Sequence, residues 1–223
     1  MLNKVSMTII AVFISVTLSG CYNIGPTEVG VKTNKTFLGG KGVQDELGDA
    51  GATKFYIPFL TEWTSFDFSQ QKLVMSASTT SGDRMGRDDM RFKTIDGNDI
   101  SLDVTITYVI DRDRAPFILQ NVARTDEEIK ELIVRTIARS KPRDIFGELE
   151  TEEFYDAVER SAKADEAKTR LNEILEPYGI IVDEVNTGDY RFNPEYQAAI
   201  EEKKLADQMV EKNKSATKAA EEE

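Results

Sequence analysis

The sequence predicts an α+β protein with an antiparallel, β-rich first half, a mixed α/β second half and a long C-terminal helix. Three observations predict this arrangement. Residues 100–110 alternate apolar and polar side chains with a period of two, which is typical of a half-buried strand. Residues 129–137 place apolar side chains at helical spacing after a capping box. Residues 195–223 are rich in Ala, Glu and Lys and contain no Gly or Pro, which favours a long exposed helix.

The amino-acid composition argues against several classes of function. The 223 residues include 28 Lys and Arg against 40 Asp and Glu, a net charge of −12. This acidity argues against nucleic acid as the main partner, because phosphate binding needs a basic field. The chain has no histidine, which excludes imidazole-based catalysis and His-ligated metal sites. Its single cysteine excludes an intrachain disulfide. We therefore expect a binding or scaffolding protein with no catalytic residue, no metal and no cofactor.

Residues 1–20 form a separate segment, which we interpret as a secretory signal peptide. Lys4 is the only charge in residues 1–27, and an apolar stretch from Val5 to Leu18 follows it. That stretch spans about 21 Å as a helix, which is short of a hydrocarbon layer of about 30 Å. A positive start, a short apolar core and small residues at its end are typical of a secretory signal.

The end of this segment, Leu18-Ser19-Gly20-Cys21, resembles the lipobox of bacterial lipoproteins. The resemblance implies cleavage before Cys21, a lipid on its thiol and a lipidated linker over residues 21–26. Several acyl chains anchor firmly, since each buried CH₂ contributes about 0.8 kcal/mol. Two alternatives stay open: an uncleaved membrane helix and a buried core cysteine.

By the same resemblance, Tyr22 stands where an aspartate marks inner-membrane retention in enteric bacteria. We therefore expect a lipid-anchored protein of the bacterial cell envelope. It would lie on the non-cytoplasmic, periplasmic side, with the outer membrane favoured.

Residues 27–110 are predicted to form a β-rich subdomain. Val29 and Val31 indicate a short strand, and the glycines within residues 39–51 mark turns. Residues 76–89 are rich in Ser, Thr, Gly and Asp and are interpreted as a surface loop. The turn residues Asp96-Gly97-Asn98 connect two apolar runs, which predicts a hairpin.

Six of the nineteen aromatic residues fall within residues 55–68. Such a cluster either packs in the core or sits at a bilayer interface, where Trp and Tyr are favoured. We expect most of these rings in the core. Anchoring at Cys21 would bring this end of the chain near lipid, so we name three candidate membrane contacts: Phe59, Leu60 and Trp63.

Residues 111–193 are predicted to form an α/β subdomain. Thr125 to Glu128 resemble a capping box, and the helix it opens is expected to end at Pro142 or to give way there to the next element. A second helix is expected over residues 152–176, followed by a strand over residues 180–185. Residues 194–223 form the last segment, a helix or coiled coil. Its apolar seam is thin and Ala-rich, so it needs neighbouring chains.

The order of these pieces resembles the stomatin/prohibitin/flotillin (SPFH) superfamily over residues 25–210. Five segments carry the resemblance: Thr27 to Val31, Gly51 to Pro58, Thr94 to Tyr108, Tyr178 to Val185 and Gln197 to Lys203. A lipobox stands where most relatives carry a membrane helix or hairpin. The loop 76–89 is longer than usual.

The resemblance implies an SPFH-type domain whose copies assemble laterally into rings or cages on a membrane. Some bacterial relatives enclose and regulate membrane-anchored AAA proteases. We therefore expect a homo-oligomeric scaffold that organises membrane lipids or membrane proteins without catalysis. A regulator or adaptor of a membrane-bound AAA protease is the alternative. A monomeric lipoprotein that binds a small ligand is a third hypothesis.

Overall fold

The computed structural model describes residues 20–36 and 40–221. Contacts divide the chain into two units. The first unit holds the described residues up to Leu73 together with Ile106–Lys141 and Asp165–Val185. The second unit holds Val74–Thr105, Pro142–Ala164 and the residues from Asn186 onward. The α+β class predicted from the sequence is confirmed, because strands dominate the first half and helices the second.

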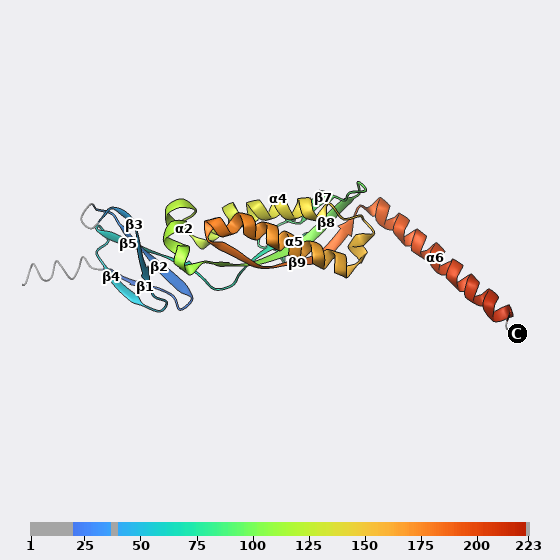
Figure 1. Cartoon of the computed structure of the whole chain (residues 1–223), viewed down its shortest axis with the longest axis horizontal. Helices are drawn as coiled ribbons and strands as arrows, with labels where there is room; N and C mark the ends of the chain where they lie inside the picture. The colour runs from blue at the N-terminus through green and yellow to red at the C-terminus, as the bar shows by residue number, and fades with distance from the viewer. Residues whose placement is uncertain (1–19, 37–39, 222–223) are drawn as a thin grey trace, which may run out of the picture. The chain divides into compact units, whose positions relative to one another are not determined.

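The first unit begins with five strands (Figure 1). Strand β2 (Glu28–Asn34) lies between β3 (Gly42–Gly48) and β5 (Thr61–Asp67), antiparallel to both. The predicted strand at Val29 and Val31 is confirmed, and both side chains are fully buried. Strand β3 runs through the stretch that its glycines had marked as turns.

Strand β1 (Gly20–Asn23) was not predicted. Residues 20–23 were expected to end the signal peptide and to begin a linker. They pair instead with β4 (Thr53–Tyr56) in an antiparallel ladder that sets Cys21 opposite Phe55. The pairing satisfies backbone groups that a linker would leave to water.

A second sheet is built around β8 (Asp99–Ile110), which pairs with β6 (Gln71–Met75), β7 (Met90–Lys93) and β9 (Ile180–Phe192). The predicted alternation is confirmed: all six apolar side chains of its inner face are buried. The predicted hairpin is also confirmed, since Met90 pairs with Leu102 and the turn contains Gly97 at φ 88°.

The helical elements follow β8 in the chain. The α-helices are α2 (Ala115–Asn121), α3 (Asp126–Glu128), α4 (Arg135–Phe146), α5 (Ala157–Leu175) and α6 (Pro194–Glu221). A π-helical stretch, Ile129–Val134, joins α3 to α4. Short 3₁₀ turns lie at Arg112–Arg114, Glu153–Tyr155 and Glu176–Tyr178.

The predicted capping box is present in altered form. The Thr125 hydroxyl accepts the N–H of Glu128 at 3.1 Å, as expected. The Glu128 carboxylate, however, accepts the N–H of Arg124 at 2.7 Å, one residue before the N-cap.

Three predicted boundaries were wrong. The second helix, expected from residue 152, begins at Ala157, because Glu153–Tyr155 form a separate 3₁₀ turn before it. Helix α4 continues through Pro142 to Phe146. Proline removes one helical N–H, but the buried Ala138 and Phe146 on either side stabilise the continuous helix. Strand β9 extends to Phe192, well past the predicted residue 185, because it continues beside β8: the Asn193 N–H bonds the Asp99 carbonyl.

Each unit has its own buried apolar set. In the first unit, Asn172 of α5 (Figure 1) ties this helix to β9, because its amide bonds both the N–H and the C=O of Val182 at 2.7 and 2.9 Å. The buried residues of this unit include Phe66, Ile106, Tyr108, Ile118, Leu171 and Leu175. Those of the second unit include Phe92, Ile100, Leu102, Phe146, Leu149 and Phe154.

Candidate functional site

Cys21 lies on β1 with an exposed, unoxidised thiol. The alternative of a buried core cysteine is therefore wrong. Gly20, the lipobox residue before it, begins β1 with the Tyr56 ring against its backbone. Leu18 and Ser19 lie outside the described residues. A thiol at this position is open to modification from solvent.

An exposed apolar turn adjoins Cys21. We define the apolar turn as residues 55–60, which close β4 and lead into β5. Phe55, directly across from Cys21, is 77% exposed, and Phe59 is 58% exposed. The turn is held by its own backbone, since the N–H groups of Leu60 and Thr61 both bond the Ile57 carbonyl at 2.9 Å. The exposed thiol and several apolar side chains thus share one edge of the first unit.

The three predicted membrane contacts fare differently. Phe59 is exposed, and Leu60 is half-buried. The prediction for Trp63 is corrected: its side chain is only 8% exposed and points into the fold, so it does not contact a membrane. Its ring fills space left by Gly30 and Gly48, which face each other across β2 and β3. Phe55, which the prediction omitted, is the more exposed aromatic.

Ile24 ties the segment after Cys21 to the fold. It is buried, and its N–H bonds the Ala52 carbonyl at 3.0 Å. A Cβ added at Gly30 or Gly48 would lie 2.5 or 2.4 Å from the Ile24 Cδ1. The Ile24 side chain therefore occupies a slot that only two glycines leave open, three residues from Cys21.

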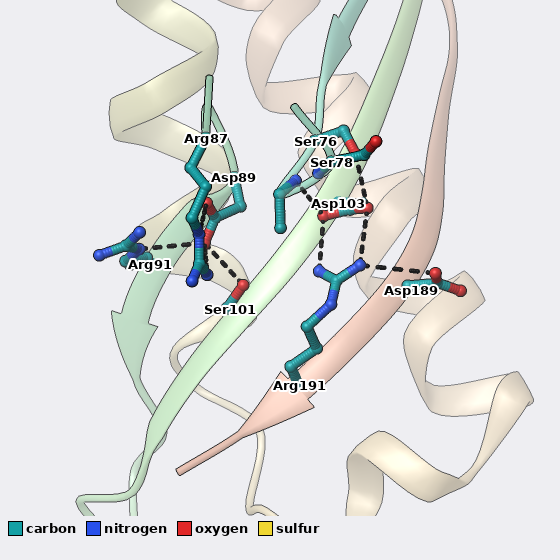
Figure 2. Close-up of polar contacts among 10 residues, drawn as sticks. Ser76, Ser78, Arg87, Asp89, Arg91, Ser101, Asp103, Asp189 and Arg191 are labelled. Carbon is teal, nitrogen blue, oxygen red and sulfur yellow. Dashed lines mark hydrogen bonds and ion pairs between the residues drawn. The ribbon is translucent and has the colours of Figure 1, made fainter. Parts of the chain in front are cut away.

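The loop 76–89 is pinned at its first end by Asp103 of β8. The Asp103 carboxylate accepts the Ser76 hydroxyl and the Ala77 N–H, each at 2.9 Å. Figure 2 shows Arg191 of β9 facing the same carboxylate, which it binds with two nitrogens at 2.8 and 3.1 Å. Burial opposes ionisation here, but the bonds from Arg191, Ala77 and Ser76 keep the pKa of Asp103 below its usual value.

The other end of the loop is pinned through Asp89, whose side chain is almost fully buried. It accepts two bonds from Arg87 at 3.2 and 3.1 Å, one from Arg91 at 3.0 Å and one from Ser101 at 2.6 Å (Figure 2). Burial again opposes ionisation, yet these donors hold the pKa of Asp89 well below its usual range.

The body of the loop folds back over the sheet. The Asp88 N–H bonds the Ser76 carbonyl at 2.8 Å and closes the loop at its base. Asp83 bonds both the N–H and the C=O of Val74, at 2.9 and 3.2 Å. The loop predicted from composition is therefore a fixed structure, in which Met85 is fully exposed.

A third carboxylate with a shifted pKa lies in the first unit. Asp126, at the start of α3, accepts the Asp67 N–H at 3.3 Å. Burial raises its pKa to about 6, and the charges of Asp67 and Glu28 act in the same direction against weaker opposing hydrogen bonds from Asp67 and Gln71. The carboxylate thus carries a charge at neutral pH in surroundings that disfavour it.

We expect Asp126→Asn to stabilise the protein above pH 6. The folded state binds this proton more tightly than the unfolded chain does, so its stabilising effect is complete below the ordinary carboxyl pKa. The effect is lost as the pH rises through about 6. Because the group is half-buried, we expect a gain of only about 1 kcal/mol at neutral pH. Urea titrations at several pH values measure it. The exposed neighbour Glu127→Gln is the control, and an equal gain there would contradict the assignment.

One pocket of about 510 Å³ lies in the second unit, between β7 and the end of α4. Its walls combine the apolar side chains of Phe92 and Ile95 with charged groups of both signs. Lys93 and Glu148, two of those groups, are ion-paired to Asp99 and Lys163. The lining gives no basis for assigning a small ligand. Within residues 20–36 and 40–221, no group of three or more potential metal ligands comes together.

None of the helices in the described part of the chain combines the length and the apolar run needed to cross a bilayer. A family described as "SPFH domain / Band 7 family" matches residues 22–223. No curated protein matches the chain.

Proposed function

Because the chain belongs to the SPFH domain / Band 7 family, whose members are generally membrane-associated scaffolds without catalysis, we propose that it is a self-assembling membrane scaffold. In this proposal a lipid on Cys21 holds each copy at the bilayer, and many weak lateral contacts join the copies. Multivalent attachment then makes the assembly bind more firmly than one copy does.

The observation that carries the proposal is the position of Cys21. The thiol is exposed, and it lies across the ladder from the exposed Phe55 and beside the apolar turn. Apolar side chains next to a lipidated residue add burial in the interface, at about 25 cal/mol per Å² removed from water. Phe55 and Ile57 replace Trp63 as proposed membrane contacts, beside Phe59, which the sequence predicted.

The short segment from Cys21 to Ile24, which we call the tether, limits how an anchored copy can move on the membrane. Ile24 is locked into its slot, and β1 is paired along its length, so the lipid is joined to the fold through few free backbone bonds. An anchor of this kind restricts the tilt of each copy on the membrane. Restricted tilt favours lateral contact, because less orientational freedom is lost on assembly.

Helix α6 supports self-association. It is 28 residues long and carries exposed apolar side chains at Leu205, Met209 and Val210. Leu205 and Met209 are one turn apart and so share a face. A single exposed seam of this kind is stabilised by a parallel helix from another copy. Family members typically associate with membranes and oligomerise.

We place the assembly on the periplasmic face of a bacterial envelope membrane, with the outer membrane favoured, on the basis of the lipobox and Tyr22. The alternative role, regulation of a membrane-bound AAA protease, uses the same anchor and assembly. It predicts a stoichiometric ATPase-protease in material purified from membranes under mild detergent.

The experiment that tests the proposal examines full-length protein extracted in detergent from its native membrane. Native mass spectrometry and electron microscopy are expected to find a ring or cage, and peptide mass analysis an N-terminal peptide that begins at Cys21 and carries lipid. A monomer at high protein concentration would refute the scaffold, and a peptide that retains residues 1–20 would refute the lipid anchor.

A further inference from the structure

Four aromatic rings meet where β9 ends and α6 begins. Phe192 stacks on Tyr155 with 5.4 Å between the ring centroids, and Tyr190 meets the same two rings edge-on at 5.6 and 5.9 Å. Tyr196, in the first turn of α6, lies against Phe192 at 5.6 Å. Aromatic pairs at these separations attract one another beyond the area that they bury. We call these four residues the aromatic joint.

The aromatic joint is continuous with the core of the second unit. The Tyr190 ring lies 6.3 Å from the ring of Phe154, which is fully buried and in turn contacts Phe92 at 5.9 Å. The Arg160 guanidinium lies 4.9 Å from the centre of the Tyr190 ring, a cation–π contact. Helix α6 is therefore attached to a packed core and not to a surface loop.

The end of β9 is held on its opposite face as well. Successive side chains of a strand point to opposite faces, so Arg191 points away from Tyr190 and Phe192. Figure 2 shows Arg191 against the Asp103 carboxylate, to which it donates two bonds of 2.8 and 3.1 Å. A rotation of the strand end would therefore break contacts on one face or the other.

The connection from β9 to α6 is a single residue, Asn193. Its N–H bonds the Asp99 carbonyl at 3.2 Å, and its side chain accepts the N–H of Glu195 at 3.0 Å, which caps the start of the helix. Pro194 follows at the first helical position, where its fixed φ suits the helix. Such a connection leaves α6 little freedom at its first turn.

The exposed apolar side chains that support self-association lie further along α6, at Leu205 and Met209. Met209 follows Tyr196 by a helical length of about 20 Å, so a tilt of about 10° at Tyr196 would move Met209 by about 3 Å. A shift of that size is enough to disturb the packing of one helical seam against another. The direction of α6 at the aromatic joint therefore decides how the seams of neighbouring copies meet.

We propose that the aromatic joint fixes the direction in which α6 leaves the body of the second unit, and that this direction sets how many copies close one assembly. The inference rests on the proposed scaffold function and names its positioning residues. Copies related by one fixed rotation close into a ring of one size. A flexing joint would allow a range of rotations, and the copy number would then vary from one assembly to the next.

The first test measures the direction of α6 within one copy. Cys21 is the only cysteine, so the full-length chain carrying Cys21→Ser accepts two nitroxide labels at chosen sites. Ile95→Cys, on the body of the second unit, and Glu211→Cys, on α6, are both at exposed positions. Dilution into an excess of unlabelled chain in detergent isolates the distances within one copy. Pulsed electron paramagnetic resonance is expected to find one narrow distance distribution.

Tyr196→Ala is expected to broaden that distribution at least about twofold, because it removes the ring that α6 contributes to the joint. Tyr196→Phe keeps the ring and should keep the narrow distribution. Tyr178→Ala, the same truncation at an exposed tyrosine of the first unit, is the matched control and should change nothing. Circular dichroism checks that each variant keeps its helices, so that a broader distribution reports the joint and not unfolding.

The second test counts the copies in an assembly. Full-length protein with Cys21 intact is extracted from membranes in mild detergent and measured by native mass spectrometry. The wild type is expected to show one copy number, and Tyr196→Ala a spread of copy numbers. Tyr196→Phe and Tyr178→Ala should match the wild type.

The outcomes separate the joint from the scaffold. A broad distance distribution in the wild type, or a narrow one in Tyr196→Ala, would overturn the joint and leave the scaffold standing. A broadened distribution with an unchanged copy number would overturn the link between the direction of α6 and assembly size. A wild type that stays monomeric at high protein concentration would refute the scaffold and that link together, whereas the distance measurement would still decide the joint.

Discussion

Replacing Cys21 by serine is expected to abolish incorporation of labelled palmitate and to change the mass of the N-terminal peptide. A hydroxyl does not form the thioether that joins the lipid, and the chain has no second cysteine to substitute for it. The wild type should yield a lipid-bearing peptide that begins at residue 21. The variant should keep its precursor mass, because processing at a lipobox follows lipid attachment.

The consequence for localisation is tested with residues 1–20 exchanged for an ordinary secretory signal. Serine at position 21 should then move the protein into the soluble periplasmic fraction, because each lost acyl chain removes about 0.8 kcal/mol per buried CH₂. Asn23→Ser, on the same strand, is the control; it keeps the chain's own residues 1–20, and with them the lipobox, and should stay in the membrane fraction. A wild type that incorporates no label and yet stays in the membrane fraction would instead support an uncleaved membrane helix.

Much of the fold follows from local patterns in the sequence. The alternation along β8 predicted its buried face, from Ile100 to Ile110, because a half-buried strand shows its period within a few residues. The 3₁₀ turn with Pro177 and the left-handed Gly179 ended the second helix as predicted. The family resemblance was likewise found from local motifs, and the family match over residues 22–223 confirms it.

Features that depend on distant partners were not predicted. Composition marked 76–89 as a loop, but its anchors are Asp103 and, 88 positions further on, Arg191. Asp103 sits on the polar face of β8, where the strand pattern predicts a solvated side chain. One signal for this anchor was present in the sequence: aspartate is rare in the middle of a long strand, so its presence there indicates a specific partner.

Trp63 shows the same limit. A tryptophan near a predicted lipid anchor suggested the bilayer interface. Its burial depends on Gly30 and Gly48 meeting across β2 and β3, and no local pattern shows that pairing. Because Gly30 and Gly48 have no side chains, their pairing leaves a gap on one face of the sheet. Trp63 and Ile24 fill this gap.

Gly48→Val is expected to destabilise the protein by about 3 kcal/mol, at the upper end of what overpacking costs. The added Cβ alone would lie 2.4 Å from the Ile24 Cδ1 and 3.0 Å from Trp63. The Ile24 side chain is buried between two strands and the indole, so it has no free direction in which to move. Chemical denaturation of the chain without residues 1–20 measures the change. Gly82→Val is the control, because its nearest neighbouring atom is 3.6 Å away and leaves room.

The double variant decides whether the slot is the cause. Ile24→Ala removes three carbons and alone should cost about 3 kcal/mol through the cavity it leaves. Gly48→Val adds three carbons on the facing side of the same slot. The double variant conserves the volume and should cost clearly less than the sum, with a coupling of about 2 kcal/mol. Simple additivity would show that Gly48 and Ile24 do not share a slot, and the tether from Cys21 to the fold would then be looser than we propose.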